Sequence, residues 1–379
     1  MKYIDEYRDS RLARSLAKAI AHAAVPTASY YFMEFCGGHT HAISRYGIED
    51  LLPDNVHLIH GPGCPVCVLP VGRIDMAIRL AARPDVTLCT YGDLMRVPGT
   101  KGASLLSARA AGADIRMVYS TQDAVRIAEA EPMREVVFFA IGFETTTPPT
   151  ALAIRLAEKK RLTNFTVFCN HVLTPSAIQN ILESPDVREF GRVRIDGFIG
   201  PAHVSTVIGT QPYAFFAEEF EKPVVVAGFE PLDVLQGVLM LIRQVNEGRH
   251  EVENQYRRAV RPEGNARAQA DVAEFFELRK GFEWRGLGVV PYSGLRLKER
   301  YAAFDAERRF GLEEIQAADN PACECGAILR GVKKPADCKL FGTACTPDTP
   351  MGSCMVSAEG ACAAHWTYGR YRDQARKAS

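Results

Sequence analysis

The chain has 379 residues, of which 47% are hydrophobic and 24% are charged, as in a soluble globular protein large enough for two or three domains. Its 45 basic and 45 acidic residues cancel, so net charge indicates neither a nucleic-acid-binding protein nor attraction to an anionic membrane. Charges run through the N-terminal stretch and no long apolar run occurs, so we expect no signal peptide, no transmembrane helix and a cytoplasmic location.

The first two thirds of the sequence alternate short apolar runs with helical patterns. Several runs are apolar throughout, which is typical of strands buried on both faces of a parallel sheet. Strands are expected at 30–35, 56–60, 86–91 and 115–120, and in a second series at 135–142, 165–171, 196–200 and 223–228. Helices are expected between them, for example at 71–82, 121–131, 147–160 and 231–246. This alternation predicts βαβ units.

The predicted fold class is therefore α/β, with two domains of mostly parallel sheet. A helical segment would occupy residues 1–29, and the two α/β domains residues 30–125 and 126–240. The rest, 241–379, is expected to be a mainly helical and irregular domain, with a short strand pair within 282–297. Its last part is rich in Cys, Gly and Pro and has no core pattern, so a metal centre would help to hold it together.

Chemically useful side chains follow the predicted strands. In open parallel sheets, ligands bind beyond the carboxyl ends of the strands. "CGGHTH" follows the first strand, "GPGCPVC" the second and "GDLMRVPG", with Asp93 and Arg96, the third. In the second series, the same positions hold Glu144, His203 and Glu230, of which the two glutamates are the weaker candidates.

Cys36 stands just before a predicted helix start. That position lowers a thiol pKa and favours the thiolate, which is both a nucleophile and a soft-metal ligand. The alternative is a buried cysteine at a strand end. His39 and His41 would be hydrogen-bond donors to the site or residues that merely begin the helix. His203 would otherwise be a structural histidine, and Asp93 a cap of the next turn.

The Cys64/Cys67 pair has three interpretations: a zinc half-site, another metal site or a redox dithiol. No second Cys-x-x-Cys occurs in the chain, which disfavours zinc and makes the dithiol the preferred interpretation. Cys89 and Cys169 lie within apolar strands and are expected in the core.

Six cysteines fall between Cys323 and Cys362. Disulfides are rare in the cytosol, so metal ligation is the better explanation. The gaps after Cys325 are wide and contain Pro and Gly, unlike the short knuckles of structural zinc. This spacing favours an iron–sulfur cluster wrapped by a loop.

Together, the motifs resemble the HypD family of hydrogenase maturation factors. The resemblance runs from about Cys36 to Tyr368 and rests on "CGGHTH", "GPGCPVC", "GFETTTPPT", "GPAHVSTVIG", "VVAGFEPLDVLQG", "VENQYRRAV", "WRGLG" and the cysteine-rich ending. It implies two α/β domains and a third domain with a [4Fe–4S] cluster. It also implies work with a HypC-type chaperone on the Fe(CN)2CO unit of nickel–iron hydrogenases, with cyanide supplied by HypE and, upstream, HypF.

The resemblance also implies roles for single residues. Cys36 would bind the transient iron together with a cysteine of the chaperone, and Cys64 and Cys67 would form a redox-active dithiol nearby. Cys325, Cys338, Cys345 and Cys362 fit the family's cluster pattern, which leaves Cys323 and Cys354 as additional thiols. Asp93, His203 and Glu359 match further functional positions.

The resulting hypothesis is a relay of electrons from the cluster through Cys64/Cys67 to iron at Cys36, with His39 and His203 donating hydrogen bonds to thiolate or cyanide. Attaching cyanide from a thiocyanate-like donor consumes two electrons, which a dithiol can deliver. Whether the chain is itself an enzyme is left open by the sequence. The alternatives are a free-standing iron–sulfur thiol–disulfide oxidoreductase and a zinc-stabilised binding module.

Overall fold

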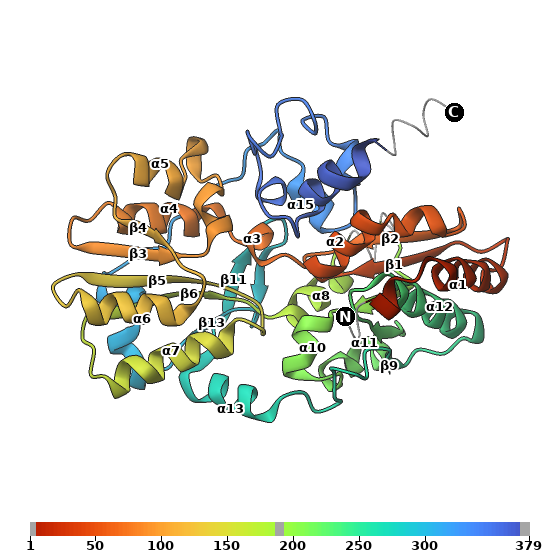
Figure 1. Ribbon diagram of the computed structural model, residues 1–379, viewed down its shortest axis with the longest axis horizontal. Helices are drawn as coiled ribbons and strands as arrows, with labels where there is room; N and C mark the ends of the chain where they lie inside the picture. The colour runs from red at the N-terminus through yellow and green to blue at the C-terminus, as the bar shows by residue number, and fades with distance from the viewer. Residues whose placement is uncertain (1–4, 186–192, 372–379) are drawn as a thin grey trace.

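The computed structural model describes residues 5–185 and 193–371. Two parallel β-sheets lie side by side, each covered by helices, and the C-terminal region lies across them at the top of the view (Figure 1). The predicted α/β class is confirmed. No helix of the described residues is long and apolar enough to cross a membrane.

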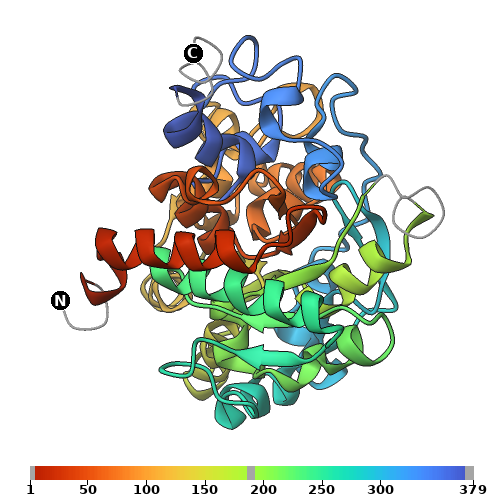
Figure 2. The same cartoon turned by 90° about the vertical axis from the view of Figure 1, so that its right-hand side faces the viewer.

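The first sheet has five parallel strands. Its order is β2 (Val56–His60), β1 (Tyr30–Glu34), β7 (Gly197–Gly200), β8 (Val224–Val226) and β9 (Val252–Asn254). Helices α1 (Ser10–Ala23) and α12 (Pro231–Glu247) pack against each other beside it (Figure 2). Their apolar faces share one buried cluster with β1, β2 and β8.

The second sheet has four parallel strands. Its order is β4 (Ile115–Met117), β3 (Val86–Thr90), β5 (Glu135–Gly142) and β6 (Phe165–His171). The strands β3, β5 and β6 are buried along nearly their whole length, as their continuous apolar runs predict. The helices that accompany this sheet are α4 (Val71–Ala81), α5 (Leu105–Ala110), α6 (Thr121–Ala130) and α7 (Thr147–Lys159).

The strands do not divide between the sheets as predicted. The stretches 30–125 and 126–240, expected as separate domains, each contribute strands to both sheets. After β6 the chain returns through α8 (Thr174–Glu183) and places β7 directly beside β1. Apolar runs reveal where strands form, but pairing depends on long-range packing, which is why the grouping was wrong.

The remaining helices and strands are not part of the two parallel sheets. The helices α2 (Gly37–Tyr46) and α3 (Pro65–Val68) follow β1 and β2, and α10 (Ala202–Ile208) and α11 (Ala214–Glu218) come between β7 and β8. The strand pair predicted within 282–297 is present as the antiparallel hairpin β11 (Gly281–Trp284) and β12 (Gly288–Pro291). A second pair joins β10 (Phe276–Leu278) to β13 (Leu295–Leu297), after α13 (Ala266–Phe275). The C-terminal region contains α14 (Ala306–Arg309), α15 (Cys325–Leu329) and α16 (Ala361–Ala364) among long irregular stretches.

Candidate functional site

The carboxyl ends of β1 and β2 bring Cys36 and the Cys64 loop together. Cys36 is the N-cap residue of α2, and Cys64 is the N-cap residue of α3. The Gly37 N–H donates to the Gly63 carbonyl at 2.8 Å. A Cβ atom on Gly63 would lie 2.3 Å from the Cys36 nitrogen, so only glycine permits this close approach. The predicted meeting of these two motifs at one sheet edge is present.

Cys64 and Cys67 form a disulfide across the first turn of α3, with Cα atoms 5.2 Å apart. The Cys67 N–H donates to the Cys64 sulfur at 3.2 Å. The two residues are 3% and 0% exposed, so the pair is shielded from water. The pair is therefore present in its disulfide form in this structure.

The Cys36 thiol is buried at the meeting point of two helix starts. Burial, together with the negative charges of Glu359 and Glu34, raises its pKa to about 12. The backbone N–H groups of Gly38 in α2 and His203 in α10 hydrogen-bond the sulfur and act in the opposite direction. The predicted position before a helix is therefore confirmed, but the predicted lowering of the pKa is wrong, because burial and the carboxylates outweigh the helix start.

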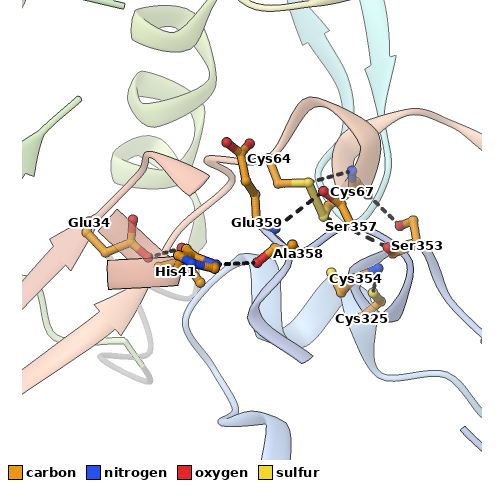
Figure 3. Close-up of a disulfide and its surroundings, with 11 residues drawn as sticks. Glu34, His41, Cys64, Cys67, Cys325, Ser353, Cys354, Ser357, Ala358 and Glu359 are labelled. Atoms are coloured by element: carbon orange, nitrogen blue, oxygen red, sulfur yellow. Dashed lines mark hydrogen bonds between the residues drawn. A yellow bond between two sulfur atoms is a disulfide. The ribbon is translucent and has the colours of Figure 1, made fainter. Parts of the chain in front are cut away.

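Glu359 reaches this site from the far end of the chain. A Cβ atom on Gly37 would lie 2.6 Å from a carboxylate oxygen of Glu359, which places the acid directly against the start of α2. Figure 3 shows its side chain beside Cys64. Burial raises the pKa of Glu359, and the nearby charges of Asp93 and Glu34 raise it further.

Asp93 is an exposed residue of the 3-10 turn Gly92–Arg96 that follows β3, and it lies near enough to Glu359 to raise the pKa of that carboxyl. The turn is fastened to the C-terminal region because Arg96 donates to the carbonyls of Pro347 and Val356 at 3.1 and 3.4 Å. Asp93 and Glu359, separated by most of the sequence, are thus brought to the same side of the site.

His39 and His203 both pack against the ring of Phe229, with centroid distances of 5.1 and 4.2 Å. The His39 Nε2 lies 3.0 Å from the carbonyl oxygens of Ala227 and Gly228, so Nε2 carries the proton. Burial lowers the pKa of His39 and favours this neutral tautomer, in which Nδ1 can only accept a hydrogen bond. The predicted role of His39 as a donor to thiolate or cyanide does not suit this tautomer.

The side chain of His203 is exposed overall, unlike that of His39. The loss of water around its ring, and then the nearby His39, lower the pKa of His203. His41, the third histidine considered, places Nδ1 3.3 Å from the Ala358 carbonyl and so also touches the C-terminal region.

Glu34 and His60 also belong to the site, and the sequence reasoning did not select them. Glu34 is fully buried and accepts hydrogen bonds from the Cys36 N–H at 3.0 Å, from the Thr40 hydroxyl and from His60 Nδ1 at 2.7 Å. Burial alone would lower the pKa of His60, but the hydrogen bond and charge of Glu34 raise it overall. The available signal was a single acidic residue within the otherwise apolar "YYFMEF".

The other candidates have structural roles. Glu144 is buried, which raises its pKa to about 7, and it accepts hydrogen bonds from the Thr174 N–H and hydroxyl, both at 2.9 Å, at the start of α8. Glu230 caps α12 and pairs with Arg8. Cys89 and Cys169 are buried in β3 and β6, as predicted for core residues.

The C-terminal cysteines surround one small cavity. Its lining includes five thiols and the apolar side chains of Ile328, Leu340, Phe341 and Met355; the cysteines are Cys323, Cys325, Cys338, Cys345 and Cys362. The four predicted cluster ligands therefore face one space, and Cys323 faces it too. Within the described ranges, no three His, Cys, Asp or Glu side chains are grouped closely enough to hold a single metal ion. Thiols are soft donors, and four of them are the number that an iron–sulfur cluster or a structural zinc site uses.

The cavity and the disulfide are joined by two consecutive residues, Ser353 and Cys354. The Ser353 hydroxyl donates to the Cys67 carbonyl at 2.8 Å, and the Cys354 N–H donates to the Cys325 sulfur at 3.4 Å. Figure 3 shows this succession from Cys64 and Cys67 to Cys325. The two groups of thiols are thus in contact through a single short segment of backbone.

The sequence is similar to known proteins along nearly its whole length. A family profile described as "HypD: Hydrogenase formation hypA family" matches residues 11–369. The chain is 76% identical to "Hydrogenase maturation factor HypD" of Rhizobium leguminosarum bv. viciae, with 100% of this chain and 98% of the relative covered. It is 75% identical to "Hydrogenase maturation factor HypD2" of Bradyrhizobium diazoefficiens (100% of each) and 48% identical to "Hydrogenase maturation factor HypD" of Escherichia coli (99% and 100%). The chain therefore belongs to the HypD family of hydrogenase maturation factors.

Proposed function

We propose that this HypD-family chain is the scaffold on which the Fe(CN)2CO unit of nickel–iron hydrogenases is assembled. The single observation that carries the proposal is the meeting of Cys36, the Cys64/Cys67 pair and Glu359 at one place, through the close contact of Gly63 with Cys36 and of Glu359 with Gly37. A soft thiol, a two-electron couple and a carboxylate in one buried site suit work on a metal with cyanide ligands.

The iron is the cargo of this site. Cys36 would provide one ligand, and a cysteine of a HypC-type chaperone another. Binding of iron displaces the thiol proton, and the backbone N–H groups of Gly38 and His203 then stabilise the thiolate. Glu34, by accepting the Cys36 N–H, fixes the backbone from which the sulfur projects.

The dithiol would provide the electrons for cyanide transfer from HypE, whose donor group is prepared with HypF. Cleavage of the S–C bond in a thiocyanate, R–S–CN, needs two electrons. The balanced step is R–S–CN plus the Cys64/Cys67 dithiol, giving R–SH, CN⁻ bound by iron, the disulfide and one proton. Glu359, whose side chain lies beside Cys64 (Figure 3), would receive that proton.

The resident cofactor implied by the resemblance is a [4Fe–4S] cluster. Cys325, Cys338, Cys345 and Cys362 would hold it in the cavity that they line. When bound, it supplies one-electron transfer. Ser353 and Cys354 keep this cavity in contact with the Cys67 end of the disulfide.

The test is anaerobic co-purification with the chaperone, followed by iron analysis and infrared spectroscopy for cyanide and carbonyl stretches. Cys36→Ala should abolish both bands and the bound iron, whereas Cys89→Ala, which removes a buried thiol in the other sheet, should retain them. Unchanged bands in Cys36→Ala would refute the proposed iron ligand.

The alternatives have less support. A free-standing thiol–disulfide oxidoreductase needs a pair that external substrates can reach, and Cys67 is completely buried. Turnover of a general disulfide by the chain alone would favour it. A zinc-stabilised binding module would be colourless, whereas an iron–sulfur protein is brown.

A further inference from the structure

A second cavity lies outside the site described above. Its volume is about 540 Å³, within the range of pockets that hold small organic molecules. It is formed by the loop 98–102, by residues 318–321 and by Arg285, which follows β11 in the turn of the β11–β12 hairpin. None of the residues placed around Cys36 lines it.

Arg285 is a buried cation with an unused donor in this cavity. Its side chain is 1% exposed, and Nη1 has no hydrogen-bond partner among the described residues. Nη2 makes a long hydrogen bond of 3.5 Å to the Pro98 carbonyl, and Nε forms an ion pair of 3.0 Å with Asp319. A buried guanidinium with an unpaired N–H is unfavourable, and a planar oxyanion satisfies it with charge-assisted hydrogen bonds.

Lys101 lines the same cavity and adds a second positive charge. It is exposed and has a left-handed backbone, with φ of 57°. The loop is held in place because Asp75 accepts hydrogen bonds from the Thr100 N–H and hydroxyl, at 2.9 and 2.5 Å. Among the lining residues the two cations are Arg285 and Lys101, and the acidic residue is Asp319.

The cavity borders both groups of thiols. The Arg285 N–H donates at 2.7 Å to the carbonyl of Val68, the last residue of α3, which carries Cys67. The next residue, Gly286, lies so close to Gly326, beside Cys325, that a Cβ atom on it would be 2.5 Å from the Gly326 Cα. A molecule held by Arg285 would therefore contact the hairpin turn that lies against both α3, at Val68, and α15, at Gly326.

We propose that this cavity binds a small organic oxyanion, with a phosphate or carboxylate group held by Arg285 Nη1 and the Lys101 ammonium. Asp319 competes with the ligand for the guanidinium. The unpaired buried donor, the two cations that line the cavity and the size of the cavity each support a ligand of this class. This inference is independent of the proposed assembly of iron at Cys36.

Calorimetric titration of the full, anaerobically purified chain tests it, with inorganic phosphate and succinate as separate probes. We expect one of them, or both, to bind; phosphate alone indicates a phosphate ligand and succinate alone a carboxylate ligand. Lys101→Ala should weaken binding by about threefold to tenfold, since one charged contact is lost. Asp319→Asn should tighten it, because Arg285 then loses its competing carboxylate.

The matched control is Lys159→Ala, which removes an exposed lysine at the end of α7 that does not line the cavity. It should leave both affinities unchanged. Tighter binding by Asp319→Asn cannot come from misfolding, so this variant keeps the test decisive even if replacement of Arg285 itself prevents folding. Failure of both probes to bind, or binding that Lys101→Ala and Asp319→Asn leave unchanged, would overturn the proposal.

Discussion

The buried site around Cys36 and the cavity lined by C-terminal cysteines are built in different ways. At the buried site, Cys36 and Cys64 cap helices that follow two neighbouring parallel strands, and backbone hydrogen bonds fix their positions. In the cavity, the thiols come from a region of short helices and irregular loops. Secondary structure thus assembles the first site, whereas we expect the second to depend on the metal centre proposed for its thiols.

From this difference we expect the folding stability of the two sites to depend differently on a bound metal. Regular elements with their own buried core stay folded without a ligand, whereas a loop region ordered around a metal loses stability with it. Four sets of substitutions test whether the two sites differ in this way.

The largest effect is expected when the predicted cluster ligands are removed. In a double variant with Cys345→Ala and Cys362→Ala, hydrogen exchange of the amides in 338–362 should become at least about 100-fold faster, because the metal-dependent stabilisation is gone. Amides of β1 and β7 should exchange as before. Mass spectrometry of exchanged peptides measures both.

Its control is the double variant Cys89→Ala with Cys169→Ala, which removes two buried thiols from the second sheet. It should not change exchange in the C-terminal region. Full protection of 338–362 in the first double variant would mean that this region is folded independently of a cluster.

Gly63→Ala tests the close contact between Gly63 and Cys36. The added Cβ would meet the Cys36 backbone at 2.3 Å, so we expect a destabilisation of about 1–3 kcal/mol and loss of iron from the complex with the chaperone. Denaturant unfolding and iron analysis measure the two effects. Gly112→Ala strains an exposed left-handed turn, with φ of 104°, and should cost stability without loss of iron.

His60→Gln tests the ion pair between His60 and Glu34, the buried carboxylate that also accepts the Cys36 N–H. The pKa of His60 is raised in the folded protein, so its stabilisation is complete below the ordinary pKa of 6.5 and is lost as pH rises through the folded-state value. The variant should therefore be less stable than wild type by about 1–2 kcal/mol at pH 6, and by less at pH 9. A difference that grows with pH, in urea unfolding at both values, would contradict a protonated His60 paired with Glu34.

Ser353→Ala should have the smallest effect. It removes the hydrogen bond to the Cys67 carbonyl, which is worth about 1 kcal/mol, and leaves all the thiols in place. Urea unfolding measures the loss, and Ser176→Ala, which removes a hydroxyl that bonds the Tyr292 carbonyl at an exposed position, is the control. A loss of several kcal/mol would show that Ser353 has a further structural role.

Much of the fold could be predicted from the sequence. The strands at 56–60, 135–142 and 165–171 have the bounds expected of them, because each is a continuous apolar run with clear ends. Their distribution between two sheets could not be predicted, since β7 joins β1 across more than 160 residues of sequence. Local patterns contain no information on such pairing.

The candidate site could also be predicted only in part. The rule that parallel strands end at one edge correctly joined Cys36 to Cys64. It could not find Glu34, which lies within a strand, or the effect of burial on Cys36, which depends on residues as distant as Glu359. Glu359 itself was selected from the family resemblance alone.

The central claim is that the Cys64/Cys67 dithiol supplies the two electrons for cyanide transfer to iron at Cys36. The most direct measurement is an anaerobic single transfer from the cyanide donor, with accessible thiols counted in the unfolded protein before and after, beside the infrared signal of iron-bound cyanide. We expect wild type to lose about two thiols for each cyanide transferred. Cys64→Ser should transfer none, and normal transfer by this variant would contradict the account.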